Sequence, residues 1–578
     1  MKRTDIIQKL NLEQKCALLS GETVFTTRAL PGKGIPAITL SDGPNGVRKQ
    51  AGAADHLGLN PSVPATCFPT SSATACSWDE KLGEAVGEAL GEEAAAQEVA
   101  VLLGPGLNIQ RSPLCGRDFE YFSEDPILAG RMAAAYVRGI QKNGISACPK
   151  HFAVNSQELR RMASDSVLDE RTLRELYLTG FEIVVKEAKP KTIMTSYNLI
   201  NGTYANENAH LLQDILRKDW GFDGAVVTDW GGSNDHALGV KNGSTLEMPC
   251  PGGDSIRELM KAVQDGKISE ADVDARLDEM LELVFSTHAA VEKAPRTFDA
   301  AAHHKLARRA AAESIVLLKN EGGILPLKPN EKLAVIGDFA ETPRYQGAGS
   351  SAVNALQVDT LLDSIKADDS GITFVGYASG FERQGAADAE KLEEAVALAK
   401  KADTVLLCLG LDELRERAEL VGLMRHGGAA RHKQVGVLGH NAVLLVQVER
   451  EVEAMAQLGE ILQRAAQEGD VTADGTAARQ TRDGLGHDGL EDGSGDVLGT
   501  GAFVEQRLHV GLGKNAAAAG DGIDGGGVGR EFVKAAGVGV QQSGHLVDEG
   551  ARAAGAGAVH ALLDAVFEVD NLRVLAAE

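Results

Sequence analysis

Residues 221–232 read GFDGAVVTDWGG, and this stretch decides how the first half of the chain is interpreted. A turn with two glycines leads into the short apolar run 225–228, and Asp229-Trp230 and two more glycines follow. A short apolar run flanked by glycine is typical of a buried parallel strand. Asp229 would then lie at the carboxyl end of the strand, where α/β barrels keep their chemistry. The alternative is that Asp229 only caps the next helix.

The same alternation of strand, polar residue and helix recurs along the first half of the chain, after a lead-in that reads as helical over residues 1–30. The strand-like runs are residues 35–40, 99–103, 145–148, 192–195, 225–228 and 245–248. Such alternation predicts parallel strands joined by right-handed crossovers. The polar residues that follow strands are Asp42, Lys150, His151, Tyr197 and Asp229. We therefore predict an N-terminal (α/β)8 TIM-like barrel over residues 1–287, with these side chains at one mouth.

An open, doubly wound sheet is the alternative architecture, and it would place the same side chains along a crevice. Such sheets often bind nucleotides at a glycine-rich turn. Because no GxGxxG motif opens a helix after the first strand, the sequence gives little support to nucleotide binding.

Composition narrows the class of protein further. The 578 residues carry a formal net charge of −24, which argues against nucleic acid or an anionic membrane as partner. The first residues, MKRTDIIQKLNLEQK, lack the apolar core of a secretory signal, and no apolar run is long enough to span a membrane. Seven scattered cysteines without a CxxC motif predict reduced thiols, a cytoplasmic location and no zinc site.

A second α/β pattern follows a predicted linker at residues 288–310. Strand-like runs at 333–336, 372–375 and 404–409 indicate a domain over residues 311–413. Residues 414–578 differ in character, because they contain no Pro, Tyr or Trp and are dense in Gly and Ala. We treat this last part as an atypical segment in which no coherent fold is recognisable.

Several long motifs stand in a fixed order in the first half. They are SDGPNGVR (41–48), GPGLNIQRSPLCGRDFEYFSEDP (104–126), CPKHFAVNSQE (148–158), MTSYNLINGTYANEN (194–208) and VVTDWGG (226–232). Together they resemble family 3 glycoside hydrolases over about residues 1–412. The hexosaminidase branch of that family typically carries KHFPGHG. The KHFAVN text of this chain instead resembles the β-glucosidase branch.

The resemblance implies hydrolysis of terminal non-reducing β-D-glucosyl residues by a retaining mechanism, in which two carboxyl groups lie about 5–5.5 Å apart. It makes Asp229 the nucleophile. The substrate-binding residues that it implies are Asp42, Arg117, Lys150, His151, Tyr197 and Trp230. The expected partner is a small β-glucoside or oligosaccharide, and no cofactor is expected. A metal-dependent barrel enzyme is the weaker reading, because His151 is the only histidine at a predicted strand end.

Several of these assignments have an alternative. Asp42 is either an acceptor for two sugar hydroxyls or a cap for the turn at Gly43-Pro44. Arg117 and Lys150 either donate to hydroxyls or form structural ion pairs. Tyr197 either positions Asp229 or lines the sugar pocket, and Trp230 offers a flat face to a sugar ring.

The chain departs from the family where the resemblance places the acid/base glutamate, on a loop after the strand 404–409. The α/β sandwich domain therefore looks incomplete, and only Glu416 and Glu419 lie near the expected place. A shift of reading frame near residues 413–415 explains this most simply, and a truly divergent C-terminal half is the alternative. Two other functions stay open: a sugar-binding remnant that lacks the acid/base, and a β-xylosidase.

Overall fold

The computed structural model describes residues 2–52, 60–112, 115–249, 251–318, 320, 323–347, 349–383, 388–410, 442–447 and 573–577. Glu416 and Glu419, the candidates for the acid/base, lie outside the described residues. So does most of the predicted atypical segment 414–578, including the region of the suggested shift in reading frame.

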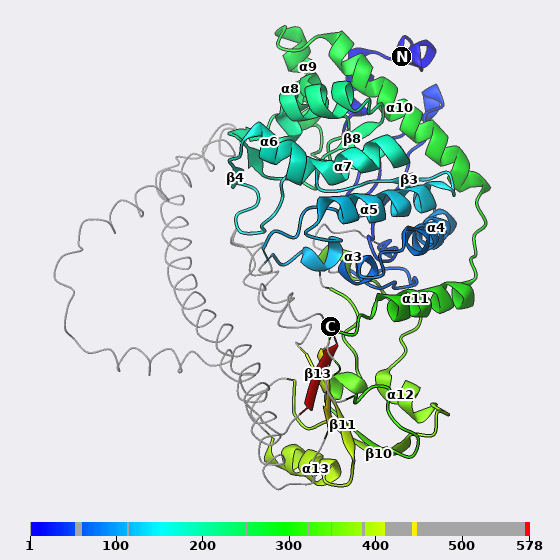
Figure 1. Ribbon diagram of the computed structural model, residues 1–578. Coiled ribbons are helices and arrows are strands. Elements are labelled where there is room, and N and C mark those ends of the chain that lie inside the picture. Colours follow the sequence, from blue (N-terminus) through cyan, green and yellow to red (C-terminus); the bar gives the residue numbers. More distant parts are fainter. Residues whose placement is uncertain are drawn as a thin grey trace, which may run out of the picture. The chain divides into compact units, whose positions relative to one another are not determined.

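Short parallel strands form the main sheets in the first half of the chain (Figure 1). One sheet has the order β1-β2-β3, and a second pairs β5 with β8. The bounds are β1 Leu40–Asp42, β2 Val101–Leu103, β3 Ser146–Ala147, β5 Thr192–Met194 and β8 Ala225–Val227. Every pairing in these two sheets is parallel, as the alternation of strands and helices predicts.

Single bridges join these sheets into a continuous series. Phe152 pairs with Thr195, Val227 with Leu246, and Ser20 with Glu247, all in parallel orientation. Backbone hydrogen bonds then lead back to β1, because the Leu40 N–H donates to the Phe25 carbonyl at 2.8 Å. The described pairs therefore close a ring, in which the last links, Gly21 with Thr27 and Thr26 with Thr39, are antiparallel, and the carboxyl ends of the parallel strands meet on one side.

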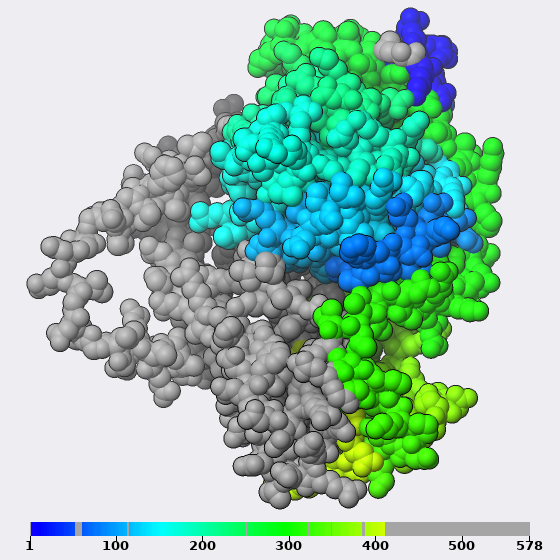
Figure 2. Space-filling model, viewed as in Figure 1, coloured from blue at the N-terminus to red at the C-terminus, as the bar shows by residue number. Residues whose placement is uncertain are grey.

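Helices cover the outside of this ring. The longer ones are α4 Glu80–Ala96, α5 Pro126–Gln141, η6 His210–Asp219, α9 Asp254–Gln264 and α10 Glu270–Lys293. The run 170–188 is helical throughout and consists of α6 Glu170–Thr172, η3 Leu173–Leu178, α7 Thr179–Ile183 and η4 Val184–Ala188. Figure 2 shows the blue and cyan side chains of α4, α5 and α7 in one closed layer.

Shorter elements complete this part of the chain. They are α1 Thr4–Ile7, α2 Leu12–Ala17, η1 Pro31–Lys33, α3 Ser71–Ala75, η2 Asp118–Glu120, β4 Asp165–Ser166, β6 Leu199–Ile200, β7 Thr203–Tyr204, η5 Ala205–Glu207 and α8 His236–Asn242. The helical lead-in predicted over residues 1–30 is wrong beyond α2. Thr23 is the reason, because its hydroxyl accepts from the N–H groups of Phe25 and Thr26 and so favours a turn over a helix.

A glycine seam lets α4 and α5 approach closely. Gly83, Gly87 and Gly91 recur at every fourth residue of α4, on the face toward α5. A Cβ on Gly87 would lie 2.4 Å from the carbonyl oxygen of Tyr136, and one on Gly139 would lie 2.2 Å from that of Glu84. The backbones thus touch where any side chain would hold them apart.

We expect Gly139→Ala to lower the free energy of unfolding by about 1–3 kcal/mol, because the added methyl group overpacks the α4–α5 contact. Thermal melting of wild type and variant measures the effect. Gly32→Ala is the matched control, since nothing lies within 4 Å of the added Cβ there. Equal melting temperatures for both variants would contradict the close packing of α4 on α5.

A mixed sheet follows in the second part of the chain. Its five strands have the order β10-β9-β11-β12-β13, with β12 antiparallel to both of its neighbours. The bounds are β9 Lys332–Ile336, β10 Thr373–Ala378, β11 Thr404–Leu409, β12 Ala442–Gln447 and β13 Arg573–Ala577. The last two strands come from the segment in which no fold was recognisable, so the described sheet extends beyond the three predicted strands.

Helices connect the two parts. The predicted linker 288–310 holds the end of α10 and most of α11 Ala300–Ser314. His303 fixes α11 to α4, with Nδ1 2.7 Å from the fully buried carboxylate of Glu93. Further short elements are η7 Asp338–Ala340, η8 Gly349–Ser351, α12 Leu361–Lys366 and α13 Ala389–Ala399. None of the described helices has the length and apolar character needed to cross a membrane.

Candidate active site

Asp229 lies just past the end of β8, on a turn that glycine makes possible. Its carboxylate Oδ1 accepts a hydrogen bond from the backbone N–H of Trp230 at 2.7 Å. Gly231 follows with a φ of +80°, a value that favours glycine. The Gly232 N–H then returns to the Asp229 carbonyl at 2.8 Å. The turn holds the carboxylate at the carboxyl end of the strand, as the sequence predicts.

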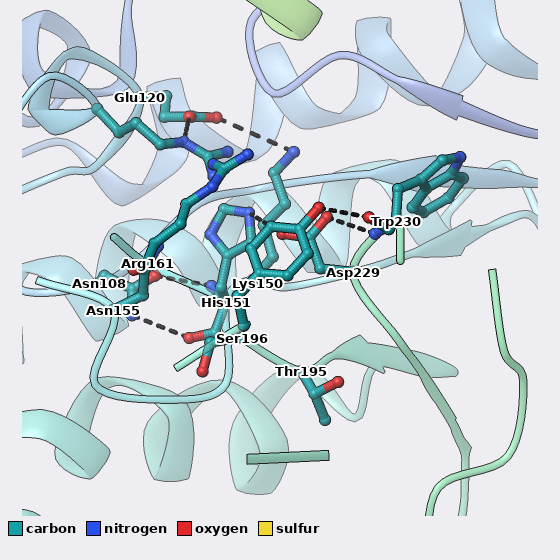
Figure 3. Close-up of polar contacts among 12 residues, drawn as sticks. Asn108, Glu120, Lys150, His151, Asn155, Arg161, Thr195, Ser196, Asp229 and Trp230 are labelled. Atoms are coloured by element: carbon teal, nitrogen blue, oxygen red, sulfur yellow. Dashed lines mark hydrogen bonds and ion pairs between the residues drawn. The ribbon is translucent and has the colours of Figure 1, made fainter. Parts of the chain in front are cut away.

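Lys150 and His151 follow β3 and are almost fully buried. Asn108 fixes them, because its Oδ1 accepts from the His151 N–H at 2.7 Å and its Nδ2 donates to the His151 carbonyl at 2.9 Å. The Lys150 carbonyl accepts from the Leu107 N–H at 2.8 Å. These hydrogen bonds hold the backbone so that both side chains lie among the other charged groups of the site (Figure 3).

Glu120 holds two cations together. Arg117 Nε donates to Glu120 Oε1, and Lys150 Nζ lies 3.9 Å from Glu120 Oε2 (Figure 3). Burial opposes the charge of Glu120, but the charges of Arg117 and Lys150 outweigh it and keep the pKa of this carboxyl below its usual value. The structural ion pair considered for Arg117 is therefore present.

Asp42 ends β1 and is 9% exposed. Burial raises the pKa of this carboxyl to about 6, and the negative charges of Asp229 and Glu120 add to the rise, whereas Lys150 and Arg48 oppose it. Asp42 therefore changes its protonation state well above the pH at which an exposed aspartate does.

Tyr197 supports the turn that carries Asp229. Its hydroxyl donates to the carbonyl oxygen of Trp230 at 2.7 Å. The guanidinium of Arg161 lies 4.6 Å above the centre of the Tyr197 ring and pairs with Glu158 at 2.8 Å. Burial, followed by the charge of Asp229, raises the pKa of Tyr197 well above its usual value, so the hydroxyl stays protonated.

Trp230 is half-buried beside Asp229. Its indole N–H donates to the carbonyl of Val24 at 2.7 Å, and its ring lies 5.4 Å from that of Phe25. The segment before β1 therefore sets the orientation of the indole.

His151 completes the group. Its Nε2 lies 3.5 Å from Asp229 Oδ2, and its Nδ1 lies 3.2 Å from the hydroxyl oxygen of Tyr121. Burial, and then the charges of Arg117, Lys150 and Arg161, lower the pKa of His151 well below its usual value. The imidazole is therefore neutral at physiological pH.

Contacts and electrostatic interactions connect the seven nominated residues that the structure describes, whereas Glu416 and Glu419 lie outside the described residues. The sequence analysis missed Asn108, Tyr121 and the interaction of Glu158 with Arg161. Asn108, Tyr121 and Glu158 all lie inside quoted motifs, so polar residues of those motifs away from strand ends were the available signal. Within the described ranges, no three His, Cys, Asp or Glu side chains are grouped so that they could hold a metal ion.

Comparisons with known proteins identify the family of the chain. The profile described as "Glycosyl hydrolase family 3 N terminal domain" matches residues 50–283, and "Glycosyl hydrolase family 3 C-terminal domain" matches residues 315–467. The second match extends past residue 412, where the resemblance was expected to stop.

Individual relatives point to the same family. Thermostable beta-glucosidase B of Acetivibrio thermocellus is 45% identical over 411 residues, which cover 71% of this chain and 54% of that protein. The exo-alpha-(1->6)-L-arabinopyranosidase of Bifidobacterium longum is 42% identical over 462 residues, covering 76% of this chain and 60% of that protein.

Solved structures agree as well. The GH3 beta-glucosidase of Bifidobacterium adolescentis superposes with a TM-score of 0.66 at 40% identity, covering 75% of this chain and 62% of that one. Beta-glucosidase 3B of Thermotoga neapolitana, in complex with alpha-D-glucose, gives a TM-score of 0.61 at 36% identity, covering 69% of this chain and 57% of that one.

Together these matches define a two-domain α/β glycosidase fold. The chain belongs to glycosyl hydrolase family 3, in its β-glucosidase branch. It spans 54% of the length of the Acetivibrio thermocellus relative and 60% of that of the Bifidobacterium longum relative.

If Asp42 accepts from the hydroxyls of a bound sugar, as the resemblance implies, glucose should bind more weakly as the pH falls below about 6, the pKa of Asp42, because a protonated carboxyl loses a charge-assisted acceptor. The loss should reach roughly 10-fold, the equivalent of one such hydrogen bond. Equilibrium binding between pH 5 and pH 8 measures it. Asp42→Asn should bind weakly at every pH, and an unchanged pH dependence in that variant would contradict the assignment.

Proposed function

We propose that this chain hydrolyses terminal non-reducing β-D-glucosyl residues by a retaining mechanism, with Asp229 as the nucleophile. One observation carries the proposal. Among the described residues, no hydrogen-bond donor satisfies Asp229 Oδ2, although this oxygen is buried in the group of polar side chains. The other oxygen, Oδ1, is held by the Trp230 N–H. An oriented carboxylate with one unengaged oxygen is suited to attack an anomeric carbon.

In the first step Oδ2 would form a bond to the anomeric carbon while the bond from that carbon to the leaving oxygen breaks. The leaving oxygen takes a proton from an acid, and we propose no described residue for that role. Water then attacks the anomeric carbon and gives a proton to the group that acted as the acid, while the bond from that carbon to Asp229 Oδ2 breaks; this releases the sugar and restores both the Asp229 carboxylate and the acid. The second carboxyl group of the mechanism would come from the part of the chain beyond residue 410.

The remaining polar groups fit the hydroxyls of a small neutral sugar. Lys150 and Arg117 supply N–H donors, whereas Asp42 supplies acceptor oxygens once it is ionised. The half-buried indole of Trp230 supplies a face for the ring carbons. The glucose complex of the Thermotoga neapolitana enzyme supports the choice of a glucoside as substrate.

Pentopyranosides are the second candidate class of substrate. The Bifidobacterium longum arabinopyranosidase, at 42% identity, supports a site that accepts a sugar ring without the sixth carbon. We also propose that the ring of strands is an (α/β)8 barrel over residues 1–287, followed by a linker and a sandwich domain that starts near residue 311.

The proposal is tested by the hydrolysis of an activated aryl β-glucoside and of cellobiose. The aryl group leaves without protonation, so its release requires the nucleophile alone, whereas cellobiose also requires the acid. We expect Asp229→Asn to lower aryl release by at least about 10³-fold. Asp223→Asn is the control, because this exposed aspartate precedes β8 and contacts Lys2.

The outcomes separate the alternatives. Hydrolysis of both substrates, lost in Asp229→Asn, means that an acid/base is present in the chain. Aryl release alone, lost in the same variant, means that the nucleophile acts without an acid, as in the impaired alternative. An Asp229→Asn variant as active as wild type, or a wild type inert toward both substrates, overturns the proposal.

A further inference from the structure

Tyr121 is fully buried and held rigidly next to His151. Its hydroxyl oxygen lies 3.2 Å from His151 Nδ1, and the two rings meet edge to face with centres 6.2 Å apart. The Tyr121 carbonyl accepts from Gln110 Nε2 at 2.8 Å. Gly106 packs so closely on the ring that a Cβ there would lie 2.9 Å from Tyr121 Cδ1. The hydroxyl thus has a fixed position, set by the backbone around it.

The proton on this hydroxyl is retained. Burial raises the pKa of Tyr121 well above its usual value, although the charge of Arg117 opposes the rise. The tyrosine is therefore a neutral O–H group that can donate or accept one hydrogen bond at His151.

The neutral ring of His151 carries one proton, on either Nδ1 or Nε2. The charged groups that act on its ring are Lys150 next to it in the chain, Arg117 on the neighbouring loop, Arg161, and the carboxylate of Asp229. A neutral imidazole has one N–H donor and one acceptor nitrogen, so the partners on each side decide between the two tautomers.

Asp229 and Tyr121 both favour the tautomer of His151 with the proton on Nε2. Asp229 Oδ2, 3.5 Å from Nε2, is an oxygen of an acceptor-only group when ionised. A proton on Nδ1 would leave the Nε2 lone pair facing this oxygen. A proton on Nε2 instead directs an N–H toward this oxygen, although no hydrogen bond is formed at 3.5 Å, and it leaves Nδ1 free to accept from the Tyr121 O–H.

We infer that Tyr121 is a positioning residue: its O–H donates to His151 Nδ1 and so keeps the proton of His151 on Nε2, toward the unengaged oxygen of Asp229. The effect on catalysis rests on the proposed function of Asp229 as nucleophile. A neutral N–H orients the attacking oxygen without transferring a proton to it. A histidine cation in the same place would form an ion pair with Asp229 and reduce its nucleophilicity.

The experiment that tests this is ¹⁵N NMR of the full chain with labelled histidine, which reports which ring nitrogen carries the proton. The His151 signals are those absent from His151→Gln. In wild type at pH 7 we expect a neutral ring protonated at Nε2. The proton on Nδ1, or a charged ring at pH 7, would overturn the inference. This measurement needs neither activity nor a folded Tyr121 variant.

Tyr121→Phe adds a second readout. Loss of the donor to the neutral ring should shift the Nδ1 signal, admit the Nδ1–H tautomer and raise the pH at which His151 titrates. An unchanged Nδ1 signal and titration would overturn the inference. Tyr136→Phe is the matched control, because this tyrosine is equally buried but lies in α5, where it packs against Phe122.

Kinetics with the aryl glucoside connect the tautomer to the chemistry. We expect kcat of Tyr121→Phe to fall roughly 10-fold with little change in KM, the equivalent of one lost hydrogen bond. An unchanged kcat in a variant with a changed tautomer would overturn the proposed effect on Asp229. A wild type inert toward the aryl glucoside would instead refute the proposed function and leave the tautomer measurement intact.

Discussion

The arrangement of the site depends on the buried ammonium group of Lys150 and its need for negative charges nearby. Lys150 is 3% exposed, and a cation in such a place is costly unless negative charges surround it. Glu120 supplies one of these charges at 3.9 Å, and the charge of Lys150 also acts on Asp42. Removing one of these partners would leave the remaining buried charges less well compensated. The ends of β1 and β3 and the loop that carries Glu120 must therefore stay together, and the ring of strands makes this possible.

The same surroundings give three carboxyl groups different characters. Glu120 lies between Arg117 and Lys150 and remains ionised, which suits a structural role. Asp42 is buried near two other carboxylates and gains a proton near pH 6. Asp229 keeps one oxygen bound by the backbone and the other unengaged. The surroundings of each carboxyl group thus suit it to a different role: Glu120 to structural ion pairs, Asp42 to accepting hydrogen bonds, and Asp229 to acting as a candidate nucleophile.

The part of the site that follows strand periodicity was predictable from the sequence. Asp229 and Lys150 come directly after apolar runs, and parallel strands bring their ends together. Asn108 and Tyr121 were not found, because each acts through a side-chain contact with His151 that leaves no periodic pattern in the sequence. The fold shows the same limit: β12 pairs with β11 and β13 across long sequence separations, and antiparallel partners so far apart have no local signal.

The orientation of Trp230 also has an optical consequence. The chain has three tryptophans, and they occupy unlike surroundings. Trp78 is 76% exposed to solvent, whereas Trp220 is 8% exposed and packs on Phe152 in the core. Only the indole of Trp230 lies beside the Asp229 carboxylate, fixed by its bond to the Val24 carbonyl. If a ligand binds beside Asp229 as proposed, the resulting change in intrinsic fluorescence is expected to arise mainly at Trp230, and occupancy could then be followed without an added dye.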